Sequence, residues 1–308
     1  MDALSQLVGL LDLRGRMDLR CLFGKDWMAP HDRVGAWKAP FHIVLRGECE
    51  LILHASRRVT RLSAGSMVIL PRGVQHTLRS PATKKETGTA IHLLDGDVVD
   101  IKSNLKHPAQ ADVEILCGEF EFHGRRRSAL LESLPEQVVI QFAGSPQALW
   151  LESLVQIMAH EIAQLRPGAG AIVSEISGAL FTLGVRTYLD EHHAIGGVLG
   201  LMQNPRLAPA LQAMLDKPHH PWTVESLAHV CSLSRATFAR DFKSLSQSSP
   251  LEMLTRLRME LASRLLTRGD QDVATVGEAV GYFSEAAFNR AFARFAGITP
   301  GRFRQQAA

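Results

Sequence analysis

The spacing of apolar residues changes along the chain. Up to about residue 122 the apolar residues form short runs that end at Gly or Pro, as at 41–45, 49–53, 67–70 and 113–122. Such runs predict β-strands joined by turns, and their number favours a barrel or jelly roll. A short amphipathic helix near 4–11 precedes them. From residue 147 onward apolar residues recur every three or four positions, which predicts α-helices.

Two helices are expected directly after the β-rich half. Their apolar faces are Leu151, Leu154, Val155, Met158, Ile162 and Leu165 in the first, and Ile172, Ile176, Ala179, Leu180 and Leu183 in the second. These faces predict either a helical collar packed on the β domain or a dimer interface, and the two are compatible. A further short helix at 207–215 ends before Lys-Pro-His-His-Pro at 217–221, which is the best candidate for a linker.

The last third of the chain repeats itself. Residues of the two copies match at an offset of 49 before a turn and of 50 after it, because the second copy has one extra residue within 281–283. Each copy has the pattern helix, turn, helix. The predicted N-caps are Thr223, Ser234, Asp272 and Ser284. Gly281 can supply the positive φ of a tight turn, and the matching phenylalanines Phe238, Phe242, Phe288, Phe292 and Phe295 are expected in the core.

The second helix of each copy also has a face outside that core. The candidate DNA-contacting residues are Arg235, Ala236, Ala239, Arg240 and Lys243 in the first copy and Glu285, Ala286, Asn289 and Arg290 in the second. Long donors beside small residues suit a helix that enters the major groove, where Arg pairs with guanine and Asn with adenine. One such face could be an ordinary solvated surface, but its repetition in register favours DNA binding. A continuous helix at 251–268 would fix the spacing of the two units.

Charge and composition support this interpretation. The net charge is +3, and the whole excess lies within 216–308, which contains 12 Lys and Arg and 9 Asp and Glu. No apolar run reaches the ~20 residues of a membrane span. The first residues show no basic start followed by an apolar block, so we expect no secretory signal. The four cysteines are scattered without a C-x-x-C pair, which fits a reducing cytoplasm and indicates neither disulfides nor a zinc finger.

The C-terminal third resembles the AraC/XylS family of transcription regulators. The resemblance covers about 218–304 and is carried by WTVESLA (222–228), LSR (233–235), FARDFK (238–243), SP (249–250), RMELA (258–262), VGY (280–282), SEAAFNRAF (284–292) and TPGRFR (299–304). It implies two helix-turn-helix units joined by a helix. Gly277 departs from the Ala usual in the family and costs ~1 kcal/mol of helix propensity. We therefore expect the first, more basic unit to anchor the protein and the second to adjust binding.

The β-rich half resembles the cupin sensor domain of one branch of this family. The resemblance covers about 2–145 and is carried by residues 2–14, FHIVLRG (41–47), GSMVILPRGVQH (65–76) and LCGEFEF (116–122). The second cupin motif is present, but the first keeps only His42. A reduced site of His42, His76 and Cys117 could hold Zn²⁺ or a similar divalent ion, with His31 and His92 as further candidates. Alternatively, the two histidines are hydrogen-bonded barrel residues and Cys117 is a small buried hydrophobe.

These observations together predict an α+β multidomain protein with three segments: a cupin-like jelly-roll domain at 1–145, a helical collar or dimerisation segment at 146–216, and a double helix-turn-helix domain at 217–308. The expected function is effector-responsive transcription regulation, with activation favoured over repression. The expected partners are double-stranded DNA, a small-molecule effector, a second copy of the chain and, for an activator, RNA polymerase. We expect no enzyme and no membrane association; the alternative is a cupin metalloenzyme with a DNA-binding appendix.

Overall fold

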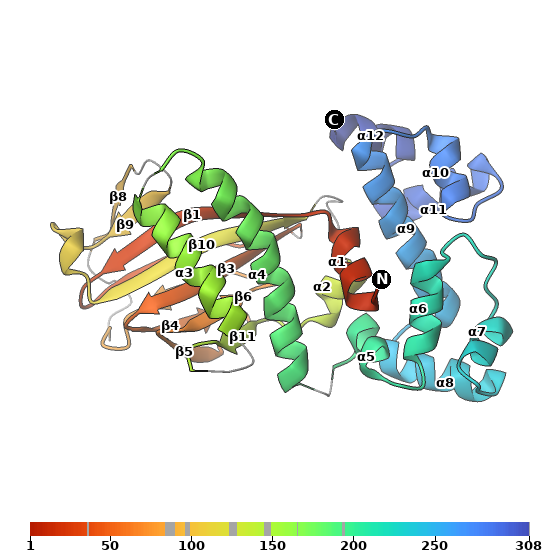
Figure 1. Ribbon diagram of the computed structural model, residues 1–308, viewed down its shortest axis with the longest axis horizontal. Coiled ribbons are helices and arrows are strands. Elements are labelled where there is room, and N and C mark those ends of the chain that lie inside the picture. Colours follow the sequence, from red (N-terminus) through yellow and green to blue (C-terminus); the bar gives the residue numbers. More distant parts are fainter. Residues whose placement is uncertain are drawn as a thin grey trace. The chain divides into compact units, whose positions relative to one another are not determined.

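The computed structural model describes residues 1–35, 37–83, 90–95, 99–122, 128–144, 149–164, 166–192 and 195–307 (Figure 1). The chain divides into two compact units, each made of segments that are separate in the sequence. We call them the sheet unit, residues 14–121 and 135–191, and the helical unit, residues 1–13, 122–134 and 192–308.

The sheet unit contains two β-sheets. The larger sheet has the order β11 (Val138–Gln141), β6 (Ser66–Ile69), β3 (Lys38–Arg46), β10 (Val113–Phe122), β1 (Leu13–Phe23), β9 (Asp100–Ser103) and β8 (His92–Leu94). The smaller has the order β2 (Met28–His31), β7 (His76–Arg79), β4 (Glu48–Leu53) and β5 (Val59–Ser63). This confirms the expected sheet-rich, cupin-like half. The structure also has strands in this half that the apolar runs did not single out, notably β1, which starts directly after the helix α1 (Ala3–Leu11) ends at Asp12 in the left-handed conformation.

Strand β3 shows how the larger sheet uses both of its faces. Phe41 stacks on Phe120 of β10 at 4.4 Å between ring centroids, and Phe120 meets Phe181 of a covering helix edge-on at 5.2 Å. His42 and Val44 are on the opposite face, because successive side chains of a strand alternate. That face closes on the smaller sheet around an apolar core that includes Val44, Leu51 and Leu78. His42 therefore belongs to the space between the two sheets.

Helices α3 (Leu149–Gln164) and α4 (Ala169–Glu191) pack on one another, and α4 packs on β11 of the larger sheet (Figure 1). The apolar face predicted for α3 is confirmed at Leu151, Val155, Met158 and Ile162, while Leu165 lies outside the described residues. The face predicted for α4 was largely wrong. Ile172 is 41% exposed, and the buried positions are Ala169, Val173, Ser177, Leu180, Phe181, Gly184, Val185, Thr187 and Leu189.

The reason is that α4 has two apolar faces, and the sequence pattern did not show which one meets the sheet. The face with Gly184 meets the sheet, and its lack of a side chain allows the close approach. A Cβ there would lie only 3.1 Å from Ile140 Cδ1 and 3.3 Å from Ile69 Cδ1. By length and composition α4 could also cross a membrane. The burial of Phe181 and Val185 in the sheet unit is, however, what a core helix of a globular protein shows.

The helical unit contains the two expected helix-turn-helix copies. They are α7 (Val224–Val230) with α8 (Arg235–Ser246), and α10 (Val273–Ala279) with α11 (Glu285–Ala296); α9 (Pro250–Arg268) joins them and α12 (Pro300–Ala307) follows. All four predicted N-caps accept a backbone N–H of the first turn, from Ser226, Thr237, Thr275 and Ala287. Gly281 has the expected positive φ of 85°. The predicted core phenylalanines Phe238, Phe242, Phe288 and Phe292 are fully buried.

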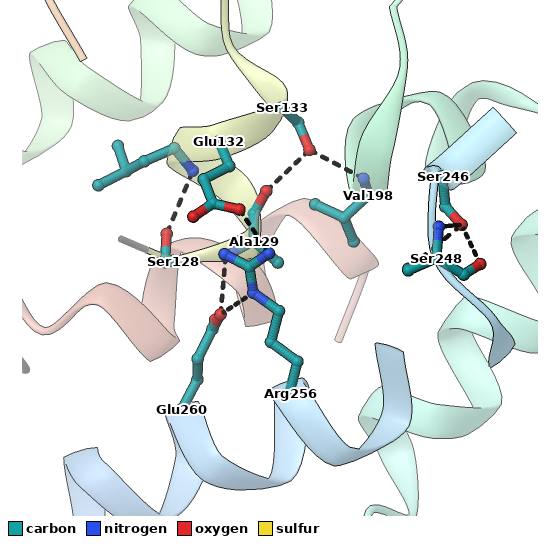
Figure 2. A network of polar contacts seen from close by, with 10 residues as sticks. Ser128, Ala129, Glu132, Ser133, Val198, Ser246, Ser248, Arg256 and Glu260 are labelled. Atoms are coloured by element: carbon teal, nitrogen blue, oxygen red, sulfur yellow. Dashed lines mark hydrogen bonds and ion pairs between the residues drawn. The ribbon is translucent and has the colours of Figure 1, made fainter. Parts of the chain in front are cut away.

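The compact units do not follow the three consecutive segments expected from the sequence. Helices α1, α2 (Ala129–Ser133), α5 (Gly197–Gln203) and α6 (Ala208–Asp216) all belong to the helical unit, and α3 and α4 to the sheet unit. The expected border between residues 145 and 146 lies outside the described residues. Helix α1 packs on α6 and α9, and α2 contacts α9 through the polar network of Figure 2.

The expected linker at 217–221 is an integral part of the helical unit. Arg258 of α9 donates to the carbonyl oxygens of Pro218 at 2.6 Å and His220 at 2.8 Å, and its guanidinium lies 6.0 Å from the ring of Tyr282. A single side chain thus ties the segment before the first copy to the turn of the second. The sequence did not reveal this, because the partners are 24 to 40 residues apart.

Candidate nucleic-acid interface and histidine cluster

Helix α8 carries the basic face of the first copy. Its core side carries Phe238 and Phe242, and its outer side carries Arg235, Ala236, Arg240 and Lys243, all of them exposed. Ala239 is half-buried. The Arg240 side chain is 74% exposed and its guanidinium contacts Asp241 of its own helix at 3.1 Å. An exposed pair of this kind is weak, so the guanidinium remains available to another partner.

Helix α11 presents a different face. Glu285, Ala286 and Arg290 are exposed, while Asn289 is half-buried and its Oδ1 is buried without a hydrogen-bond partner among the described residues. Of the two polar atoms of the Asn289 side chain, only the Nδ2 donor then remains to reach a base. Helix α8 therefore has three exposed basic side chains, Arg235, Arg240 and Lys243, whereas α11 has two, Arg290 and Arg294, together with the acidic Glu285.

The turns of the two copies differ at one residue that the sequence did not single out. Leu233 donates its N–H to Ala228 O, and Tyr282 makes the equivalent bond to Gly277 O, so Ser232 corresponds to Gly281. In the first copy Ser234, the N-cap, follows Leu233 directly; in the second, Phe283 lies between Tyr282 and the N-cap Ser284. The extra residue is thus Phe283, and its side chain is 93% exposed at the start of α11.

Gly277 has a packing reason that the sequence could not show. A Cβ at this position would lie 3.1 Å from Phe288 Cγ, closer than side chains ordinarily approach. The glycine lets α10 pack directly on the aromatic ring of α11. Close packing in a core that also contains Val276, Val280 and Phe292 therefore offsets the cost of this glycine in helix propensity.

Three histidines meet inside the sheet unit. His31 ends β2, His42 lies in β3 and His76 begins β7, and one ring nitrogen of each lies within 4.8 Å of those of the other two. His31 and His76 are partners in the β2–β7 register, and their rings stack at 4.7 Å with 5° between the planes. His42 Nε2 lies 2.8 Å from His76 Nε2.

Backbone carbonyls orient two of these rings. His76 Nδ1 lies 2.8 Å from Val74 O, and His31 Nδ1 lies 3.1 Å from Ala29 O. A carbonyl oxygen only accepts, so both Nδ1 atoms carry the hydrogen and both Nε2 atoms keep a lone pair. Among the described residues, His31 Nε2 and His42 Nδ1 are buried without a hydrogen-bond partner. The cluster therefore has more inward-facing nitrogen atoms than its own hydrogen bonds use.

Burial keeps the histidines neutral. It lowers the pKa of His31 to about 3, with the neighbouring His76 acting in the same direction. Burial and the adjacent His31 and His76 hold the pKa of His42 well below its usual range, and burial also lowers the pKa of His76. At neutral pH the three rings are therefore uncharged imidazoles, which is the form that coordinates metal ions.

The expected ligand Cys117 is not part of this cluster. It lies opposite His42 in the β3–β10 register, but its Sγ is 3.7 Å from Cys21 Sγ. The contact with Cys21, together with burial, raises the pKa of the Cys117 thiol well above its usual value. A thiol must lose its proton to bind a metal, so this environment disfavours it as a ligand. The structure brings His31 next to His42 and His76 instead, and leaves the further candidate His92 exposed on β8.

Comparison with known proteins places both halves of the chain. Residues 2–190 match the family described as Cupin, and residues 227–306 match the one described as Helix-turn-helix domain. The chain is 32% identical over 307 residues to "RCS-specific HTH-type transcriptional activator RclR" of Escherichia coli (strain K12), covering 99% of this chain and 98% of that protein. It is also 32% identical to a "Putative AraC-like transcription regulator" of Streptomyces lividans, again over 99% of this chain and 98% of the relative.

The chain belongs to the AraC-like transcription regulators. Its C-terminal part is also similar to a solved DNA-binding domain of AdpA in complex with a target DNA, at 33% identity over 33% of this chain and 92% of that one, with a TM-score of 0.32. The two family matches and the two relatives of nearly full length confirm the expected fold and family. In this regulator the duplicated helix-turn-helix units are the DNA-binding part, and the cupin-type sheet unit precedes both of them in the sequence.

Proposed function

We propose that the regulator is an effector-responsive transcription activator that binds two successive major-groove segments with α8 and α11. The observation that carries this proposal is the repeated helix-turn-helix unit, in which equivalent positions of α8 and α11 are exposed around equivalent buried phenylalanines. Activation, with RNA polymerase as a partner, is supported by the Escherichia coli relative, which is named a transcriptional activator. We place the protein in the cytoplasm, where its DNA would be.

The residues have separate roles in this proposal. Arg235, Arg240 and Lys243 supply the cationic groups of α8 for base edges and phosphates. Arg290 supplies the corresponding group of α11. Phe283 adds an exposed apolar side chain at the start of α11, where it suits the methyl group of a thymine. The first unit then provides most of the affinity and the second adjusts it.

The test is DNA binding by the full chain to sites enriched from a random duplex library. Arg240→Ala is expected to weaken binding to the enriched site by ~1–3 kcal/mol, and more than Arg290→Ala. Arg58→Ala, an exposed arginine just before β5 in the sheet unit and outside the proposed dimer face, is the control and should bind like the wild type. Affinity should also fall steeply with salt, because phosphate contacts release counterions.

Three results would each contradict a different part of the proposal. No enriched site at all would contradict sequence-specific binding. An Arg240→Ala variant with wild-type affinity would remove that residue from the interface. A larger loss for Arg290→Ala would reverse the proposed order of the two units.

We also propose that the regulator is a homodimer that uses the outer faces of α3 and α4. Trp150 is 69% exposed, Ile157 46% and Ile172 41%, although all three are large and apolar. Ile172 belongs to the second apolar face of α4, which the sheet unit does not cover. Sedimentation of the wild type against Ile157→Lys tests this: the wild type should be dimeric and the variant monomeric.

A regulator needs an effector rather than a reaction, and we propose no enzymatic activity for the sheet unit. The support is that the relatives named above are transcription regulators along nearly their whole length. The histidine cluster is the described group that best suits an effector site, since its polar atoms are buried and face one another.

A further inference from the structure

The histidine cluster has unmet bonding capacity in the middle of a hydrophobic core. His42 is 1% and His76 1% exposed, and the neighbouring core residues are apolar or thiols. A buried polar atom without a partner costs free energy, and such atoms are rare in folded proteins. Here His31 Nε2 is one of them, and the cluster brings one ring nitrogen of His31 within 4.8 Å of a ring nitrogen of each of the other two histidines.

The orientation of the rings matches that of metal ligands. A ligating histidine almost always donates its second ring N–H to a carbonyl or carboxylate, which fixes the tautomer and aims the other nitrogen. His31 does this with Ala29 O and His76 with Val74 O. His76 consequently directs the lone pair of its Nε2 at His42 Nε2, 2.8 Å away, and His31 keeps a lone pair on its buried Nε2, with its ring centroid 4.9 Å from that of His42.

The dimensions of the cluster suit a small ion. With metal–nitrogen bonds of ~2.0–2.1 Å, two nitrogens of a tetrahedral site lie ~3.3 Å apart. In the cluster the separation of His42 Nε2 and His76 Nε2 is 2.8 Å, and no pair of ligand atoms exceeds 4.8 Å. Small rotations of the rings would therefore bring all three nitrogens to bonding distance of one ion.

We propose that His31, His42 and His76 bind one divalent transition-metal ion of the Zn²⁺ type, and that this ion is an effector of the regulator. The second part rests on the proposed function. An all-imidazole donor set suits zinc, copper or nickel and does not suit Mg²⁺ or Ca²⁺, which require oxygen ligands. Three protein ligands also leave a fourth position open for water or a second small molecule.

The first experiment measures binding without DNA. The full chain is stripped with a chelator, and Zn²⁺ is titrated in competition with a chromophoric chelator. We expect one ion per wild-type chain and an affinity lowered about a hundredfold or more in His31→Gln, because even loss of an outer partner of a ligand costs 10–100-fold. His31 is chosen because it is half-buried and therefore easier to replace than His42 or His76. His92→Gln, an exposed histidine on β8, is the control and should bind like the wild type.

A Co²⁺ probe identifies the ligands. Three imidazoles and a solvent molecule should give visible d–d bands without a sulfur-to-metal charge-transfer band. A charge-transfer band that disappears in Cys117→Ser would replace His31 by Cys117 and overturn the proposed ligand set.

The second experiment measures a gel shift on the enriched DNA site with and without Zn²⁺. We expect Zn²⁺ to change the affinity of the wild type several-fold and to leave that of His31→Gln unchanged. Absence of stoichiometric Zn²⁺ binding overturns the metal site but leaves the proposed function standing, provided that the enriched DNA still binds. Stoichiometric Zn²⁺ with an unchanged DNA affinity overturns the effector role. Loss of DNA binding under every condition overturns the proposed function itself.

Discussion

Glu260 of α9 is the buried acid on which the junction between α2 and α9 depends (Figure 2). Its side chain is 7% exposed, and its Oε1 accepts the N–H of Ala129 at 2.7 Å and Arg256 Nε at 3.1 Å. Arg256 also reaches Glu132 Oε2 at 2.6 Å. Burial raises the pKa of Glu260 to about 6, against the opposing effect of Arg256, so the side chain is still mostly ionised at neutral pH.

The magnitude of each substitution follows from what it leaves unpaired. Glu260→Ala removes the acceptor of both donors and is expected to cost ~3–5 kcal/mol, as for other broken buried ion pairs. Glu260→Gln keeps an amide oxygen for the Ala129 N–H and loses only the charge, which should cost ~1–2 kcal/mol. Glu132→Gln affects a side chain that is 44% exposed, so solvent screening limits its cost to below ~1 kcal/mol.

The measurement is native-state hydrogen exchange of the full chain, read by mass spectrometry on peptides of α9. A loss of ~3–5 kcal/mol corresponds to exchange that is roughly a hundredfold to several thousandfold faster. Peptides of β3 and β10 in the sheet unit serve as the internal control and should keep their exchange rates. Equal effects of the three substitutions, or an Ala variant that exchanges no faster than the Gln variant, would refute the reasoning.

Three further predictions concern single features of the fold. Ser232 has a φ of 54° at the position where the second copy has Gly281, so Ser232→Gly should stabilise the helical unit by ~0.5–1 kcal/mol in urea denaturation. Ser244→Gly, in the last turn of α8, should destabilise it by a similar amount. A destabilised Ser232→Gly would show that the left-handed conformation is not a source of strain. Phe283→Ala should leave the melting temperature unchanged, because the side chain is 93% exposed, and should weaken DNA binding. Replacing the contacted thymine by deoxyuridine, which lacks only the methyl group, should lower the DNA affinity of the wild type and not that of the variant. An equal loss of affinity in both would exclude a methyl contact. Lowering the pH from 6.5 towards 3 should destabilise the metal-free sheet unit by up to ~1.4 kcal/mol per pH unit for each histidine of the cluster. The reason is that the pKa of His31 is about 3 in the folded state and ~6.5 in the unfolded state, so only the unfolded state takes up the proton. A pH-dependence of melting that His31→Gln does not reduce would contradict this.

The sequence by itself determined the features that depend on near neighbours. The N-caps Thr223, Ser234, Asp272 and Ser284 act on residues three positions away, and Gly281 fixes its own backbone angle. Helical and strand periodicity is equally local, and it sufficed to find both helix-turn-helix copies and most of the longer strands. The repetition of these local signals predicted the two DNA-binding units before any contact between them was known.

Only the tertiary structure decided which distant residues meet. His31 joins His42 and His76 because β2 pairs with β7 and the two sheets face one another, and Cys117 is drawn away by Cys21, which is 96 residues distant. The place of α2 in the helical unit depends on contacts such as the hydrogen bond from Ala129 N–H to Glu260, 131 residues apart. These contacts form because whole apolar faces of helices and sheets become buried against one another. A local sequence pattern shows that a face is apolar, but it does not specify which distant segment covers that face.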